Sequence, residues 1–247
     1  MPLSDAQIER YSRQIILPEV GAAGQQRLLA AACAVVGTGP LAATAARYLA
    51  GAGIGRLMLV GADADALVAE LSLLNPDVEF PRLDPGARFP PVEKGGAGRI
   101  FGAGLPAARP VSEGRYTIIA ADLPLPDLDA LVRTHPGSAL IAVGLTPSGG
   151  WLHVTGGARG CAGCAARAAA TVDRPAPAAM ATIAAGVLGA IAALEAIKHS
   201  LGLSLAAGDD WFAFDAAIAN LQSHALARVA GCAACAARSV DAPQPAR

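Results

Sequence analysis

The stretch CAVVGTGPLAATAARYLAGAGIGRLMLV, residues 33–60, decides the fold of this chain of 247 residues. It opens with the apolar run 33–36, which predicts a buried strand, and it turns at the Gly-Thr-Gly of residues 37–39. Residues 41–52 have helical periodicity and are followed by glycines that can end a helix, and residues 57–60 form a second apolar run. This pattern is a βαβ unit, and it predicts an α/β fold of the Rossmann type with a mostly parallel sheet and flanking helices.

The rest of the chain is expected to extend this unit without a linker that would divide it into two domains. We expect a single domain with an N-terminal helical arm (1–32), a nucleotide-binding-type core (33–155), a C-terminal part with a mixed or antiparallel extension (156–240) and a flexible tail (241–247). Residues 81–110 are rich in proline, glycine and arginine and predict irregular structure. The pattern predicts helices over residues 4–16, 24–32, 64–74, 127–134 and 179–201, and strands over 78–80, 117–120, 139–143, 151–154, 211–214 and 223–229.

Charge and hydropathy narrow the class of protein. The formal net charge is -1, so the chain lacks the general positive field that nucleic acid or an anionic membrane would attract, and we expect neither as a partner. The N-terminus carries Asp5 and Glu9 without an apolar run, which argues against a signal peptide. Residues 178–197 have the length of a membrane span, but alanine and glycine dominate them and no second span exists. We interpret them as a buried helix and expect a cytoplasmic protein.

The strongest chemical signal is a pair of C-x-x-C motifs, Cys161–Cys164 and Cys232–Cys235. Two intervening residues allow both sulfurs of a motif to face one ion, and two motifs complete the tetrahedral S₄ shell that structural Zn²⁺ prefers. A closed shell of four thiolates can stabilise the fold but leaves no position at which to activate water. Two unrelated redox pairs are the alternative interpretation. The fifth cysteine, Cys33, lies in the first strand and is interpreted as core.

The glycine turn is a candidate nucleotide site. Gly37, Thr38 and Gly39 lie between a strand and a helix, where free N–H groups at the helix N-terminus can bind phosphate. The alternative is that the glycines only allow the chain to turn. A ribose-binding acid normally ends the next strand, but here Gly61 follows it and Asp63 is the first acid, which we keep as a candidate cofactor-binding residue. This absence disfavours a dinucleotide-dependent oxidoreductase.

With these motifs together, the chain resembles the ThiF/MoeB/HesA family, the bacterial relatives of ubiquitin-activating enzymes. The order and spacing of the matching segments cover most of the chain, and the N-terminal block is very specific. The resemblance is carried by residues 10–21, 24–29, 35–39, 48–55, 74–78, 186–189, 194–198 and 214–216, and by the two C-x-x-C motifs.

The resemblance implies a function, acyl-adenylation. In this family ATP and Mg²⁺ bind at the glycine turn, and the C-terminal Gly-Gly carboxylate of a small ubiquitin-fold sulfur carrier attacks the α-phosphate, so that pyrophosphate leaves. It implies a homodimer in which Arg13 reaches the partner's phosphates, a task that suits the planar fork of a guanidinium. It also implies that Asp122 holds Mg²⁺, although Asp122 could instead cap the helix that follows it.

Several departures from the family pattern keep a second function open. The segment between the second strand and Asn75 is shortened, and its acid, arginine and lysine have no counterpart. Gly61 stands where the acid would be, and Pro40 and Ala42 replace glycines of the turn. The chain is therefore either an adenylyltransferase in which arginines between residues 82 and 109 replace the lost groups, or a catalytically inactive pseudoenzyme that keeps the zinc, the dimer and a carrier-binding surface.

Overall fold

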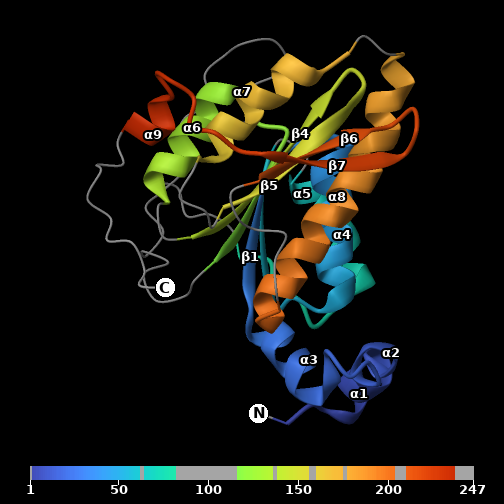
Figure 1. The fold of residues 1–247 in the computed structure, drawn as a ribbon. Helices are drawn as coiled ribbons and strands as arrows, with labels where there is room; N and C mark the ends of the chain where they lie inside the picture. Colours follow the sequence, from blue (N-terminus) through green and yellow to red (C-terminus); the bar gives the residue numbers. More distant parts are fainter. Residues whose placement is uncertain are drawn as a thin grey trace.

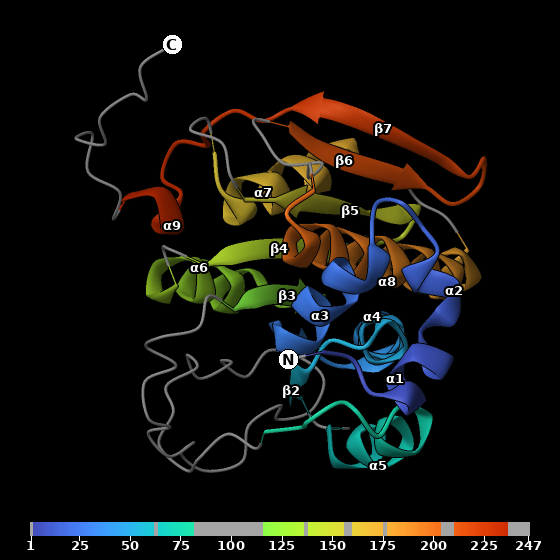
Figure 2. The same cartoon turned by 90° about the horizontal axis from the view of Figure 1, so that it is seen from below.

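The fold is built on one seven-stranded sheet with helices on both faces (Figures 1 and 2). It is seen in a computed structural model. The structure describes residues 2–61, 64–81, 116–135, 138–155, 160–174, 177–203 and 210–236.

The sheet has a parallel half and an antiparallel half. Its strand order is β2-β1-β3-β4-β5-β6-β7, and the pairs β2–β1, β1–β3 and β3–β4 are parallel whereas the remaining pairs are antiparallel. The predicted α/β class, with its mixed C-terminal extension, is confirmed. The strands are β1 (Ala32–Gly37), β2 (Arg56–Val60), β3 (Thr117–Ala121), β4 (Ala139–Thr146), β5 (Gly149–Val154), β6 (Asp210–Asp215) and β7 (Asn220–Ala225).

Helices cover the central strands on both sides, which is why β1 and β3 are buried along their whole length and, apart from Thr117, carry no polar side chain. α4 (Gly39–Ala52) and α8 (Ala178–Leu201) lie on one face, and α6 (Leu125–Thr134) and α7 (Ala162–Val172) lie on the other (Figure 2). α5 (Ala64–Leu74) packs beside α4 and β2, and the short α9 (Ala233–Ala236) packs beside α6.

α4 and α8 approach each other through small residues. A Cβ at Gly189 of α8 would lie 2.6 Å from the carbonyl oxygen of Leu41 in α4. α8 is long and apolar enough to cross a membrane, but Ala184, Leu188 and Ala192 are fully buried against α4 and the sheet. The core helix of a soluble protein can have the same length and composition.

The N-terminal arm consists of α1 (Asp5–Arg10), α2 (Ser12–Ile15) and α3 (Gly21–Ala30). Ser4 and Gln7 form a full capping box at the start of α1. The expected single helix over residues 4–16 is broken at Tyr11, whose buried hydroxyl lies 3.0 Å from Asp77 Oδ2 and 3.3 Å from Asn75 Oδ1. These bonds hold the arm against the end of α4 that lies farthest from the glycine turn.

Three further expectations differ from the structure. Residues 78–80 form only an isolated bridge, between Glu79 and Arg56, and the last strand is Asn220–Ala225 instead of 223–229. α7 was not predicted, because the residues that it buries are all small, and no pattern of large apolar side chains marks it as a helix. Most of the 81–110 region and the 241–247 tail fall outside the described residues.

Candidate functional site

The glycine turn lies where the strand order of the sheet reverses. From β1 the chain passes through α4 to β2 on one side, and it later enters β3 on the other side of β1. In open α/β sheets ligands bind at the carboxyl ends of the strands at such a point. Gly37 and Gly39 have φ values of 147° and 75°, a region that favours glycine, and Thr38 is the N-cap residue of α4. The predicted turn is therefore in a position suited to a ligand.

Two of the glycines at this edge have no room for a side chain. A Cβ at Gly37 would overlap the carbonyl oxygen of Ala121, and a Cβ at Gly61 would overlap the carbonyl oxygen of Gly37. The close packing of the turn against the end of β2 therefore leaves no room for an acidic side chain at residue 61. Asp63, the other candidate in this segment, lies outside the described residues.

A cavity of about 240 Å³ opens beside the turn, between α4, α5 and the end of β2. Across it, Arg47 of α4 forms a two-pronged ion pair with Glu70 of α5, with distances of 2.6 Å and 2.8 Å. The guanidinium hydrogen bonds lower the pKa of Glu70, so its carboxylate is ionised at neutral pH. Most of the lining is apolar: Val35, Gly37, Thr38, Gly39, Pro40, Ala42, Ala43, Arg47, Leu59, Val60, Gly61, Ala64, Ala66, Leu67 and Glu70.

Asp122 shares this edge of the sheet. It directly follows β3, and the register pairs Ala121 with Gly37 of the turn. Its φ of 53° is unusual for a residue with a side chain, and its Oδ1 accepts a hydrogen bond of 2.9 Å from the backbone N–H of Leu145. The N-cap residue of the following helix is Pro124, so Asp122 does not have the capping role that was its alternative. The structure brings Asp122 and the glycine turn together.

Arg13 lies at the opposite end of the sheet. It is exposed on α2, in the arm that leads into the start of β1 (Figure 1). The arm contacts the last turn of α4, where a Cβ at Gly53 would lie 2.7 Å from Tyr11. The glycine turn is at the other end of this 14-residue helix, a length of about 20 Å. Arg13 and the turn of the same chain are therefore not brought together.

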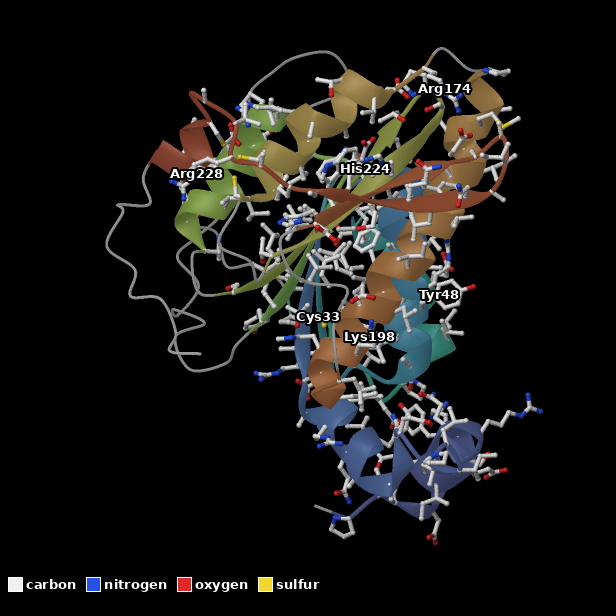
Figure 3. All side chains as sticks on the ribbon, in the orientation of Figure 1. Cys33, Tyr48, Arg174, Lys198, His224 and Arg228 are labelled. Atoms are coloured by element: carbon white, nitrogen blue, oxygen red, sulfur yellow. The ribbon has the colours of Figure 1, made fainter. Side chains whose placement is uncertain are left out.

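A second cavity, of about 270 Å³, lies where β4 ends, between α7 and the β5–β6–β7 meander. Asp173 accepts hydrogen bonds from the backbone and hydroxyl of Ser148, and Arg174 pairs with Asp215. Arg174 and His224 both line this second cavity (Figure 3), and no sequence motif predicted the cavity. The full lining is Thr146, Ser148, Gly150, Ala169, Val172, Asp173, Arg174, Trp211, Ala213, Phe214, Asp215, Ile218, Gln222 and His224.

The four predicted cysteines converge on one point, and all four are buried. Their sulfurs lie within 4.8 Å of one another, with individual separations of 3.2–3.8 Å among the hydrogen-bonded pairs. A tetrahedral Zn–S shell with bonds of about 2.3 Å has edges of about 3.8 Å, so the cluster fits such an ion with small adjustments. Two independent redox pairs would not need to meet, and the convergence favours a metal.

The environment of the sulfurs is mixed. Burial raises the pKa of Cys161 and that of Cys235, the latter to about 11. For Cys164 the raising effect of burial is outweighed by hydrogen bonds, first from the backbone N–H of Val229 at 3.4 Å, and its pKa is lowered. A metal ligand must be a thiolate, so metal binding here would displace protons from the more buried sulfurs.

Comparisons with known proteins agree with these features. Residues 11–79 match the model of the ThiF family. The adenylyltransferase and sulfurtransferase MOCS3 of Bos taurus is 59% identical over 61 residues, which are 25% of this chain and 13% of that protein. The SAMP-activating enzyme E1 of Haloferax volcanii is 40% identical over 92 residues, 36% of this chain and 34% of that protein. The chain thus matches about a third or less of the length of these relatives.

The likeness in fold extends farther than the likeness in sequence. A crystal structure of E. coli MccB with ATP superposes on 92% of this chain, and on 73% of its own, with a TM-score of 0.62. Sequence identity in that superposition is 16%, so this likeness concerns the fold alone.

Proposed function

Since the chain belongs to the ThiF/MoeB/HesA family, we propose that it is an ATP-dependent adenylyltransferase that activates the C-terminal carboxylate of a small ubiquitin-fold sulfur-carrier protein. The observation that carries this proposal is the position of Asp122 beside the glycine turn, at the point where the strand order reverses. We further propose a cytoplasmic location, with neither nucleic acid nor a membrane as partner.

In this proposal each part of the edge has a task. The backbone N–H groups at residues 37–39 and the start of α4 bind phosphate oxygens, and the apolar cavity beside them takes the nucleoside. Asp122 would hold Mg²⁺, which would supply positive charge to the phosphates as pyrophosphate leaves. The bond from Leu145 to Oδ1 orients this carboxylate, because it fixes one of its two oxygens.

The second cavity suits the tail of the carrier. It begins at Thr146, next to Leu145, and so extends from the strand end to which Asp122 is bound. Its charged groups already have partners, since Arg174 pairs with Asp215 and the Asp173 carboxylate accepts hydrogen bonds from Ser148, so a Gly-Gly backbone would not have to satisfy them. The tail would then present its carboxylate to the nucleotide at the shared edge.

A homodimer would explain the position of Arg13. Its own glycine turn is on the order of 20 Å away, at the far end of α4, so a role on phosphate requires a second copy. Exposed apolar side chains suitable for such a contact occur on the arm, at Ile16 and Leu17, and on α8, at Ile183 and Leu194.

The pseudoenzyme remains a second candidate because of two observations. Gly61 cannot be replaced by the missing acid without a clash, and Arg47, a cation beside the turn, is bound to Glu70 instead of being free for phosphate. In that case the chain would act through its metal centre and a carrier-binding surface.

ATP binding separates the two candidates. We expect isothermal titration calorimetry with Mg²⁺ to show micromolar binding by the zinc-loaded protein, weakened at least about tenfold in Asp122→Asn because a charged ligand of the ion is lost. Asparagine tolerates the positive φ and still accepts the Leu145 bond, so the variant removes the charge and keeps the local structure.

Asp5→Asn, which removes an exposed acid from the arm, is the matched control and should bind as the parent does. Binding by the parent would justify a pyrophosphate-exchange assay with candidate carriers. No heat of binding at millimolar ATP would contradict the enzyme proposal and leave the pseudoenzyme as the remaining candidate.

Mixing two inactive variants tests whether Arg13 acts across the dimer. Arg13→Ala and Asp122→Asn should each lose pyrophosphate exchange, and mixed dimers should regain it, because one site then has an intact Asp122 and an Arg13 from the other copy. With random mixing, on the order of a quarter of all sites are intact. Activity that stays absent after subunit exchange, checked with differently tagged chains, would show that Arg13 does not act in this way.

A further inference from the structure

One arginine of α7 connects three parts of the metal centre. Arg167 Nη1 lies 2.9 Å from the carbonyl oxygen of Gly163, 3.1 Å from Asp129 Oδ1 and 3.6 Å from Cys232 Sγ. Its Nη2 lies 2.7 Å from Asp129 Oδ2, so the Asp129 carboxylate accepts a hydrogen bond from each Nη atom of the guanidinium. The arginine thus bonds to the first C-x-x-C motif, to a sulfur of the second, and to α6.

The sequence of the first motif fits this arrangement. Its third residue is Gly163, whereas the corresponding residue of the second motif is Ala234. A Cβ at Gly163 would overlap Asp129 Oδ1 and would lie 2.9 Å from Arg167 Nη1. A glycine is needed at this one position because the ion pair occupies the space where a side chain would begin.

The charge of the metal centre explains how the contact between Arg167 and Cys232 could stabilise it. Four thiolates outweigh the charge of a divalent ion, so a loaded centre is anionic, and it is buried in protein where charge is poorly screened. A guanidinium that donates to a sulfur stabilises this charge, and the hydrogen bonds that Arg167 donates to the Asp129 carboxylate raise the pKa of Arg167. The side chain of Asp129 is only 5% exposed, so its orientation is fixed by packing.

We propose that Arg167 is a positioning residue of the metal centre that slows loss of the ion by donating to Cys232, and that Asp129 positions Arg167. The centre would then depend on α6, which carries none of its ligands. This role is independent of the adenylation proposed above, because it requires only that the cluster holds a metal.

A simple structural tie between α6 and α7 is the competing explanation, and metal release distinguishes the two. We expect Arg167→Met to transfer zinc to a chromogenic chelator about 10- to 100-fold faster than the parent, because loss of an outer partner of a ligand typically costs about 10- to 100-fold in metal affinity and a weaker site releases its ion faster. Arg167→Lys, which keeps the charge but loses the fork, should be intermediate, and Asp129→Asn should accelerate release less than Arg167→Met.

Arg228→Met is the matched control. Arg228 is exposed and precedes Val229, whose N–H bonds to Cys164, so the variant removes an equal charge from a segment that contacts the cluster (Figure 3). Its release rate should equal that of the parent. All rates are measured well below the unfolding midpoint of each variant, so that global unfolding does not contribute.

Cobalt supplies a readout that a structural tie would not change. In the Co²⁺-loaded protein, the sulfur-to-metal charge-transfer band should shift in Arg167→Met and stay unchanged in Arg228→Met, since only the first loses a donor to a ligand sulfur. Should Arg167→Met fail to fold, Arg167→Lys and Asp129→Asn give the same comparison. Release rates and spectra that match those of Arg228→Met in the folded variants would overturn the proposal.

Discussion

Cys232→Ser is expected to prevent metal binding by the four-cysteine cluster and to lower the unfolding midpoint by about 7–20 °C. Structural zinc contributes apparent binding free energies of about 10–16 kcal/mol in small peptides, and loss of even a third of that shifts a chain of this size by roughly 2–4 °C per kcal/mol. The effect is large because the cysteines belong to the second apolar core, where Cys161, Cys164 and Leu226 pack together. Besides the two cysteines, the described part of the segment after β7 buries Leu226 and Ala234.

Metal content by elemental analysis and the thermal midpoint check this expectation. Cys33→Ala is the matched control: Cys33 is also fully buried, but it lies in β1 and outside the cluster. It should keep one equivalent of zinc and lose only the small contribution of a buried sulfur, on the order of 1 kcal/mol. A Cys232→Ser protein that still holds a full equivalent of metal at an unchanged midpoint would contradict the assignment of this site.

The central βαβ unit could be predicted because its signals are local. Apolar runs of strand length, a glycine turn and a helix closed by Gly53 all occur within residues 33–60, and each corresponds to a structural element found there. The cysteine pairs are local signals of the same kind, since two-residue spacing is sufficient to place two sulfurs beside one ion. Their mutual approach depends on the fold, which brings residues 71 positions apart into contact.

The features that were missed depend on distant partners. At the break at Tyr11, the Tyr11 hydroxyl hydrogen-bonds to Asn75 and Asp77, more than sixty residues later, and nothing near Tyr11 in the sequence indicates these partners. The pair of Asp129 and Arg167 is 38 residues apart on two different helices. Gly163 was its one visible sign, but a glycine in a C-x-x-C turn is also expected without such a pair.

Gly61, at the end of β2, shows a different limit of prediction from sequence. In the sequence, Gly61 stands where the family pattern has an acidic residue. From the sequence alone, restoring that acid would be expected to raise the nucleotide affinity of an adenylating enzyme. In the structure, the carbonyl oxygen of Gly37 occupies the space of any Cβ at residue 61, and the methyl group of Thr38 lies 3.0 Å from that Cβ position. The turn occupies the space that any side chain at residue 61 would need, so the glycine at residue 61 and the shape of the turn depend on each other.

Gly61→Asp is therefore expected to destabilise the protein and to leave ATP affinity no better than that of the parent. Forcing a side chain into packed space costs about 1–3 kcal/mol, and here the obstacle is backbone, so we expect the upper end, about 3 kcal/mol, or a midpoint lower by roughly 6–12 °C. Gly61→Ala should lose a similar amount, because the clash begins at Cβ and does not need the carboxylate. Thermal unfolding of both variants and calorimetry with ATP and Mg²⁺ measure these effects.

Gly51→Ala separates this steric effect from the general effect of replacing a glycine. Gly51 is an exposed residue of α4 with no atom within 4 Å of a Cβ built on it, so alanine should stabilise the helix by about 0.5–1 kcal/mol. The two alanine variants should thus shift the midpoint in opposite directions. A Gly61→Asp protein that is as stable as the parent and binds ATP more tightly would mean that the turn can still open for the acid. The present shape of the turn would then be one of two conformations.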